Sequence, residues 1–177
     1  MRKINFYCVL LAILSVISFA SCDKNNETRM YIDVYPIEFK FYVLDKDSVN
    51  LLNDSTIMKE YMDKVKVIYN NNEYKCSEIV DFNKSIQSRW YAPFFKGLIM
   101  FDNGFSSSDN YVLYFGEFDG SLVYNEISFT IDWGDGTTDD IFFKGSYYNM
   151  KSNREFYLNG ELIQKGESPI FVYKFIK

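Results

Sequence analysis

The chain has 177 residues, of which 24 are acidic and 19 basic, and its net charge at neutral pH is −5. It contains no histidine, which excludes serine–histidine and cysteine–histidine catalysis and most zinc sites, because histidine supplies the base or a ligand in each. The acidic balance argues against nucleic acid as a partner, since phosphate binding depends on basic patches.

Residues 1–22 have the three parts of a bacterial export signal. Arg2 and Lys3 form the charged start, residues 7–19 form an apolar stretch, and Ala20-Ser21 supplies small residues before a cleavage point. The apolar stretch is shorter than the roughly 20 residues that a membrane-spanning helix needs. We therefore expect residues 1–21 to be a signal peptide and not a membrane anchor.

The residues Phe19-Ala20-Ser21-Cys22 resemble the bacterial lipobox. In that motif the cysteine receives a diacylglycerol and the signal is removed just before it, which implies that Cys22 is the acylated first residue of the mature chain. The alternative is a plain signal peptide followed by an unrelated cysteine. Several acyl chains, each contributing about 0.8 kcal/mol per buried methylene, hold a protein to a membrane almost permanently. Cleavage removes Arg2 and Lys3 but no acidic residue, so the net charge becomes −7.

The choice of membrane depends on Asp23, the residue after the cysteine. An aspartate there retains lipoproteins in the inner membrane of enteric bacteria, whereas in Bacteroides-type bacteria acidic residues after the cysteine accompany export to the outer surface. The chain is rich in Asn, Tyr and Phe and resembles the second group, so we expect a lipid anchor in the outer membrane, with exposure at the cell surface. Residues 22–30 are polar and predict a tether to one domain over 31–177.

Alternation of apolar and polar residues predicts strands through most of this domain, beginning at residues 37–43. A short helical turn is expected at 57–63 with Asp54 or Ser55 as its cap, and Asn70-Asn71-Asn72 predicts a hairpin turn. The expected strands after the first are 65–69, 73–76, 98–101, 111–118, 126–133, 141–148, 155–158 and 170–176, punctuated by turns at 103–104, 119–120, 134–136 and 159–160. Eight or nine short strands with hardly any helix predict an all-β fold, a single antiparallel β-sandwich.

Trp133-Gly134-Asp135-Gly136-Thr137 is the sharpest internal motif. It follows an alternating strand, and its two glycines let the chain reverse where a Cβ atom would clash. The motif resembles the signature of polycystic-kidney-disease (PKD) modules, which are immunoglobulin-like sandwiches on cell surfaces and beside secreted enzymes. The resemblance implies an immunoglobulin-like β-sandwich and no catalytic residue.

Most of the mature chain is also similar to a group of Bacteroides-type lipoproteins. Four segments carry this resemblance: Pro-Ile-Glu-Phe at 36–39, Tyr-Phe-Gly-Glu-Phe-Asp-Gly at 114–120, Ile-Asp-Trp-Gly-Asp-Gly-Thr at 131–137 and Phe-Tyr-Leu-Asn-Gly at 156–160. The resemblance brings no known activity with it.

The acidic residues around the Trp-Gly-Asp-Gly-Thr turn are candidate calcium ligands, because oxygen-rich loops can hold this ion. They are Asp132, Asp135, Asp139 and Asp140. Their spacing departs from the Asp-x-Asp-x-Asp-Gly loop, and acidic residues in turns usually make local hydrogen bonds or face water. We therefore expect no metal and no other cofactor.

An aromatic stretch at 90–95 is the candidate ligand-binding site. Trp90 and Tyr91 are candidates for stacking on sugar rings, because tyrosine and tryptophan suit half-exposed positions, while Phe94 and Phe95 are expected in the core. Cys76, left without a disulfide partner in the mature chain, is expected to be a buried structural thiol.

The expected function is that of a non-catalytic envelope lipoprotein that binds a glycan or a partner protein. One alternative is a structural or assembly accessory of the outer membrane. The other is a carboxylate-dependent hydrolase, for which Glu117 and Asp119 are the candidate pair.

Overall fold

The computed structural model describes residues 34–81, 93–102, 111–149 and 151–177, which belong to one compact unit, Asp33–Lys177. The expected signal peptide and tether, with Cys22, lie outside the described residues, as do Trp90, Tyr91 and the expected turn at 103–104. Their roles remain predictions from the sequence. Within the described residues, no helix is both long enough and apolar enough to cross a membrane.

Eleven strands and two short helical segments make up the described part of the chain. In chain order they are β1 (Ile37–Leu44), η1 (Leu51–Asn53), α2 (Ser55–Lys64), β2 (Lys66–Tyr69), β3 (Asn72–Lys75), β4 (Ile79–Asp81), β5 (Gly97–Asp102), β6 (Tyr111–Phe118), β7 (Tyr124–Asp132), β8 (Thr138–Tyr148), β9 (Lys151–Leu158), β10 (Glu161–Gly166) and β11 (Ile170–Ile176).

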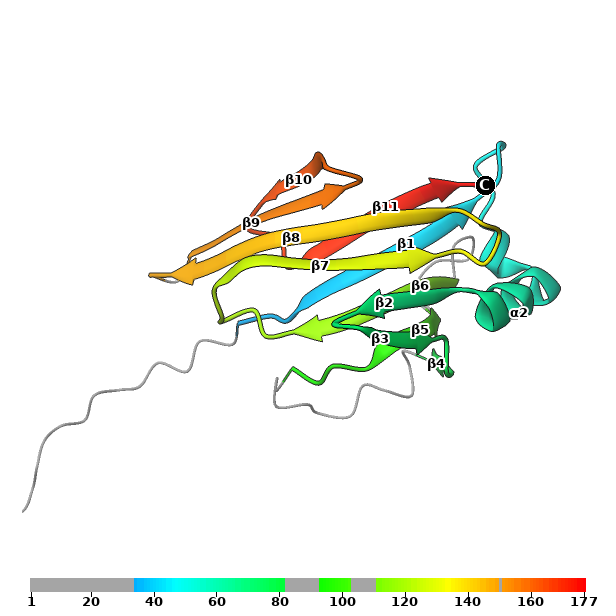
Figure 1. The fold of residues 1–177 in the computed structure, drawn as a ribbon, viewed down its shortest axis with the longest axis horizontal. Coiled ribbons are helices and arrows are strands. Elements are labelled where there is room, and N and C mark those ends of the chain that lie inside the picture. The colour runs from blue at the N-terminus through cyan, green and yellow to red at the C-terminus, as the bar shows by residue number, and fades with distance from the viewer. Residues whose placement is uncertain (1–33, 82–92, 103–110, 150) are drawn as a thin grey trace, which may run out of the picture. The chain divides into compact units, whose positions relative to one another are not determined.

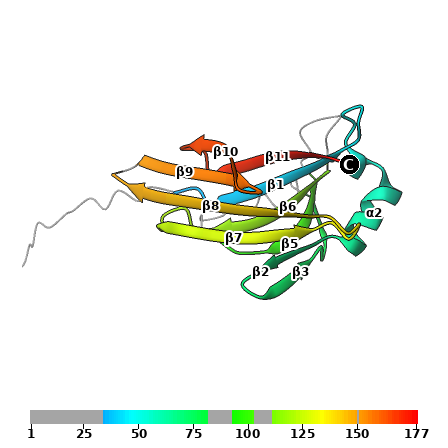
Figure 2. The same cartoon turned by 45° about the horizontal axis from the view of Figure 1, so that its top comes forward.

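The strands form two sheets, which confirms the prediction of an all-β sandwich (Figure 1). The five-stranded sheet has the order β11-β1-β6-β5-β4, and the six-stranded sheet has the order β10-β9-β8-β7-β2-β3. In Figure 2 the six-stranded sheet runs across the front of the molecule, with β1 and β11 behind it.

The six-stranded sheet is antiparallel throughout, but the five-stranded sheet is mixed, so the prediction of a purely antiparallel sandwich is wrong. β1 pairs with β11 in parallel, and β4 pairs with β5 in parallel. The chain leaves β10 in one sheet and enters β11 in the other, running in the same direction as β1. Alternation in a sequence fixes which face of a strand is buried, and it carries no information about the direction of the neighbouring strand.

The local predictions differ from the structure in three places. β10 was not expected, because its residues are mostly exposed and lack a buried face, and β4 is only three residues long. Helix α2 is longer than the expected turn, and no residue in it is fully buried. Its expected cap is confirmed, since the side chain of Asp54 accepts hydrogen bonds from the backbone of Thr56 and Ile57.

The hairpin between β2 and β3 forms where the asparagine run predicted it. Asn70 and Asn71 have φ angles of 50° and 60°, the left-handed values that a tight hairpin turn requires and that asparagine tolerates better than most residues. The register then places Ile68 opposite Glu73.

Aromatic side chains fill the space between the two sheets, and the ring of Phe39 from β1 lies at their centre. Its centroid is 4.9 Å from that of Phe129, 5.3 Å from that of Phe143 and 5.7 Å from that of Phe156, all three belonging to the six-stranded sheet. Edge-to-face and tilted pairs at these distances contribute about 0.5–1.5 kcal/mol beyond burial of their area. Within the described residues, this packing joins the sheets without a disulfide.

Two residues expected in the core are less buried than predicted. Phe94 is 69% exposed, although its neighbour Phe95 does pack against the core. Cys76 is partly buried and, like Phe95, packs against the core, and this burial raises the pKa of its thiol to about 11. The thiol is therefore protonated at neutral pH, which suits a packing role and not that of a nucleophile.

Candidate functional site

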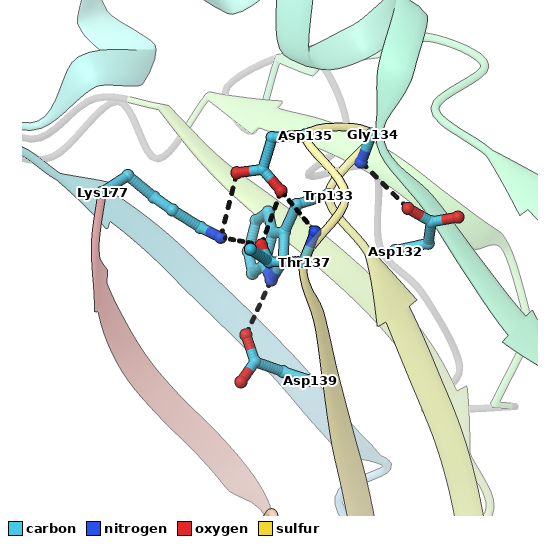
Figure 3. Close-up of polar contacts among 7 residues, drawn as sticks. All are labelled: Asp132, Trp133, Gly134, Asp135, Thr137, Asp139 and Lys177. Carbon is cyan, nitrogen blue, oxygen red and sulfur yellow. Dashed lines mark hydrogen bonds and ion pairs between the residues drawn. The ribbon is translucent and has the colours of Figure 1, made fainter.

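The Trp133–Thr137 turn joins β7 to β8 and lies at the end of the sandwich that also carries α2 and the end of β11 (Figure 1). The indole of Trp133 is 2% exposed, and its Nε1 donates a hydrogen bond of 2.7 Å to Asp139 Oδ2 (Figure 3). The Trp133 ring also packs on Phe175 of β11, with centroids 4.7 Å apart. The tryptophan is therefore part of the core and is not a surface for a ligand.

Lys177 closes this turn from the side of β11. Its ammonium lies 4.7 Å from the centroid of the Trp133 ring, donates a hydrogen bond of 2.6 Å to Thr137 Oγ1 and lies 3.3 Å from Asp135 Oδ2 (Figure 3). A cation over an indole face is attracted by the ring quadrupole. The motif therefore fastens the end of the last strand to the β7–β8 hairpin.

Each of the four candidate calcium ligands is engaged in hydrogen bonds within this region. Asp132 accepts from the backbone of Gly134, Asp135 from the backbone of Thr137, Asp139 from Trp133 and Asn159, and Asp140 from the Thr130 hydroxyl. Among the described residues, no group of three or more Asp, Glu, Cys or His side chains is arranged to hold a metal ion. The structure places these acids in turn and cross-strand contacts.

The hydrogen bonds at Asp135 favour its charged form. The Thr137 hydroxyl and backbone N–H, followed by the Lys177 ammonium, hold the pKa of the Asp135 carboxyl below its ordinary value. Because the ionised carboxylate is the better acceptor, the turn is most stable when Asp135 is charged.

The two glycines of the turn have left-handed backbone conformations, but their surroundings differ. Gly134 has φ +73°, and a Cβ atom built on it would lie 2.6 Å from the Cβ of Lys64 and 3.0 Å from the Lys64 carbonyl oxygen at the end of α2. Gly136 has φ +88°, and a Cβ atom there would meet nothing within 4 Å. Gly134 is thus required both by its conformation and by the close approach of α2.

A second region, on the outward face of the six-stranded sheet, has the features of a binding site. The register of β2, β7 and β8 aligns Ile68 with Thr130 and Thr130 with Asp140, and it places Ser128 opposite Phe142. These side chains border a hollow of about 550 Å³, which we call the outer hollow. Its lining residues are Ile68, Asn70, Asn71, Glu126, Ser128, Phe129, Thr130, Asp140, Ile141 and Phe142.

The aromatic wall of the outer hollow, the ring of Phe142, packs against a ring on the neighbouring strand. Phe142 and Tyr157 stack in parallel across β8 and β9, with centroids 4.1 Å apart and ring planes 9° apart. The Lys144 ammonium lies 5.7 Å and 5.6 Å from the two ring centroids, and the Tyr157 hydroxyl donates to Glu155. Glu155 holds the hydroxyl of Tyr157, and Lys144 lies over its ring. Because Tyr157 is held in this way, its stacking fixes the orientation of the Phe142 ring.

The candidate hydrolase pair, Glu117 and Asp119, has two separate sets of partners. Asp119 accepts hydrogen bonds from the backbone and hydroxyl of Ser121, whereas Glu117 lies 3.5 Å from the Lys96 ammonium and accepts from the backbone of Phe94. Glu117 also hydrogen-bonds the hydroxyl of Tyr114. Burial, and then the charges of Glu38 and Glu117, raise the pKa of Tyr114, so this phenol stays protonated and cannot act as a nucleophile at neutral pH.

Comparisons with protein-family models, with curated proteins and with solved structures found no match to this chain.

The sequence predicted the strands that carry the outer hollow but not the hollow itself. Phe142 and Tyr157 both fall within expected strands, and they were missed because their contact depends on the register between β8 and β9. Aromatic residues on outward-facing positions of neighbouring strands were the only signal available from the sequence.

Replacing the two turn glycines by alanine tests their different surroundings. Gly136→Ala introduces backbone strain alone and should lower the free energy of unfolding by roughly 1–2 kcal/mol. Gly134→Ala adds the overlap with Lys64, a further cost of roughly 1–3 kcal/mol for a forced displacement of α2. Thermal unfolding followed by near-ultraviolet circular dichroism should give a clearly lower midpoint for Gly134→Ala. Equal midpoints would show that α2 does not pack against the turn.

The charge of Asp135 predicts a pH-dependent difference between the wild type and Asp135→Asn. Its pKa is lowered in the folded protein, so its stabilising contribution is complete above the unfolded value of about 3.9 and is lost as the pH falls through the folded value. The thermal midpoint of Asp135→Asn should therefore lie below that of the wild type at pH 7, and the gap should narrow below roughly pH 4.

The matched control for this comparison is Asp47→Asn, which alters an exposed acid in the turn after β1. It should show no such narrowing. A wild-type advantage at Asp135 that stays constant down to pH 3 would contradict the assignment of the effect to the carboxylate charge.

Proposed function

We propose that this chain is a membrane-anchored lipoprotein of the bacterial cell envelope whose β-sandwich is a non-catalytic glycan-binding module. The anchor is inferred from the resemblance of Phe19–Cys22 to a lipobox, with the outer membrane as its location. The binding role is inferred from one structural observation, the outer hollow with its fixed Phe142 wall.

The size and shape of the outer hollow support a ligand of small or medium length. Its volume of about 550 Å³ lies within the roughly 300–1,000 Å³ typical of ligand sites. The hollow crosses three neighbouring strands, β2, β7 and β8, on an open sheet face. A chain-like ligand can therefore extend beyond the hollow along the sheet.

The chemistry of the lining supports a sugar. Phe142 and Ile68 offer apolar surface to the C–H faces of a sugar ring, and the ring of Phe142 is already held in place before any ligand arrives. Hydroxyl, amide and carboxylate groups of Ser128, Asn71 and Glu126 are of the kinds that hydrogen-bond sugar hydroxyls. A rigid aromatic group beside such polar groups loses little side-chain entropy on binding.

Binding without turnover is supported by the engagement of one lining carboxylate and by the lack of histidine. Asp140, one of the two carboxylates in the lining, already accepts a hydrogen bond of 2.6 Å from the Thr130 hydroxyl. The chain also has no histidine to serve as a base. We further infer that the sandwich is of the immunoglobulin-like type, on the basis of its two packed sheets and the Trp-Gly-Asp-Gly-Thr turn.

Phe142→Ala tests the binding role. The full chain, purified in detergent, is passed over a panel of immobilised neutral and charged polysaccharides, and the dissociation constant is measured for those that retain it. Loss of the ring should weaken binding by about twofold to tenfold, since an aromatic contact contributes about 0.5–1.5 kcal/mol.

The matched control is Val172→Ala, which shortens an exposed apolar side chain of β11 in the other sheet and should leave binding unchanged. Retention by no polysaccharide, or equal losses in the two variants, would contradict the proposal. Release of new reducing ends from a retained polysaccharide would favour the hydrolase alternative.

Cys22→Ala tests the anchor. Without the thiol there is no site for the diacylglycerol, so the variant should be missing from the washed membrane fraction or retain its signal peptide. Growth with an alkyne analogue of palmitate should label the wild type and not the variant. A wild type that takes up no label would contradict lipidation at Cys22.

A further inference from the structure

The lining of the outer hollow carries negative charge without a matching positive charge. Glu126 and Asp140 are its carboxylates, and none of the lining side chains that the structure describes belongs to lysine or arginine. The remaining polar groups are the amides of Asn70 and Asn71 and the hydroxyls of Ser128 and Thr130. Any ligand in the hollow therefore meets neutral donors and acceptors together with two anionic groups.

Three lysines of the six-stranded sheet have partners on the same face of that sheet. Lys66 lies 2.8 Å from Glu73 and 3.7 Å from Asp132, and Lys165 lies 2.6 Å from Glu155. Lys144 lies over the stacked rings of Phe142 and Tyr157. None of these three lysines is a lining residue of the outer hollow.

The two carboxylates suit sugar hydroxyls well. A hydroxyl that donates to an ionised carboxylate makes a charge-assisted hydrogen bond, which is shorter and stronger than a neutral one. The side chains of Glu126 and Ser128 make no hydrogen bond to another described residue, so both can pair with a ligand. Asp140 has one oxygen engaged by Thr130 and a second oxygen not hydrogen-bonded to a described side chain.

A carboxylate or sulfate on the ligand would be unfavourable in the same place. Two like charges 4 Å apart repel by an energy that weakens binding about fivefold in water, and more strongly where the ligand excludes water. Among the described lining residues, there is no lysine whose positive charge would offset this repulsion.

We propose that the outer hollow selects uncharged glycans and rejects glycans that carry carboxylate or sulfate groups, with Glu126 and Asp140 as the selecting residues. This inference rests on the proposed function, because it specifies the ligand class of the same site. The neighbouring lysines, considered alone, would suggest a preference for anionic glycans, whereas this proposal predicts that anionic glycans are rejected.

Matched pairs of polysaccharides test the selection. Each pair consists of a neutral polymer and the carboxymethylated or sulfated derivative of the same backbone, and binding of the full chain in detergent is measured at low and moderate salt. The neutral polymer that binds should do so at least fivefold more tightly than its charged derivative, and the difference should shrink as salt screens the repulsion.

Glu126→Gln separates charge from shape. It keeps the size and an acceptor oxygen of the side chain but removes the charge, so it should strengthen binding of the charged derivative by about fivefold. Binding of the neutral polymer should weaken, because its hydroxyl loses a charge-assisted hydrogen bond. Glu161→Gln, which neutralises an exposed acid of β10 outside the lining, is the control and should alter neither.

The outcomes distinguish the two proposals. Tighter binding of the charged derivative, or binding of a cationic polymer such as chitosan alone, would overturn the selection while leaving a glycan-binding module in place. An unchanged preference in Glu126→Gln would also overturn it. Retention by no polysaccharide of any charge would remove the proposed function and the selection together.

Discussion

The contact between the two sheets depends on aromatic packing around Phe39. One strand of the five-stranded sheet supplies this ring, and three strands of the other sheet supply Phe129, Phe143 and Phe156 around it. The mature chain proposed here has no disulfide available, so this buried aromatic cluster must supply the stability that many exported domains obtain from cross-links. The face of β8 that carries Phe143 is fixed by this core, and the opposite face, which carries Phe142, is therefore fixed as well.

The outer hollow depends on this difference between the inward and outward faces of single strands. Along β8, Ile141 and Phe143 are buried while Asp140 and Phe142 lie on the outward face. Because the inward residues set the position of the strand, the outward residues are free to vary in chemistry without weakening the core. A rigid sheet with adaptable outward positions is a suitable base for a binding surface, since little order has to be gained when a ligand arrives.

Sequence patterns predicted which face of an expected strand is buried, but they did not predict which distant strands pair with one another. The alternation at 127–133 placed Phe129, Ile131 and Trp133 on the buried face, as observed. The parallel pairing of β1 with β11 could not be foreseen, because it joins segments more than 120 residues apart and leaves no local signal. The same limit applies to the candidate site. The stack of Phe142 on Tyr157 is a matter of register between strands, and the fastening of Lys177 to Trp133 depends on the path of the last strand.

The position of β1 bears on how a tethered domain responds to force. β1 is the first described strand after the proposed lipid in the sequence, yet it is not an edge strand, because it is bonded to β11 over residues 38–44 and to β6 over residues 37–41. A pull along β1 from its N-terminal end would load these two ladders in shear and would not open them one bond at a time. The rate of forced unfolding is then set by simultaneous rupture of many hydrogen bonds. Under the proposed anchor and binding role, the drag of a bound polymer would reach the membrane through these two ladders.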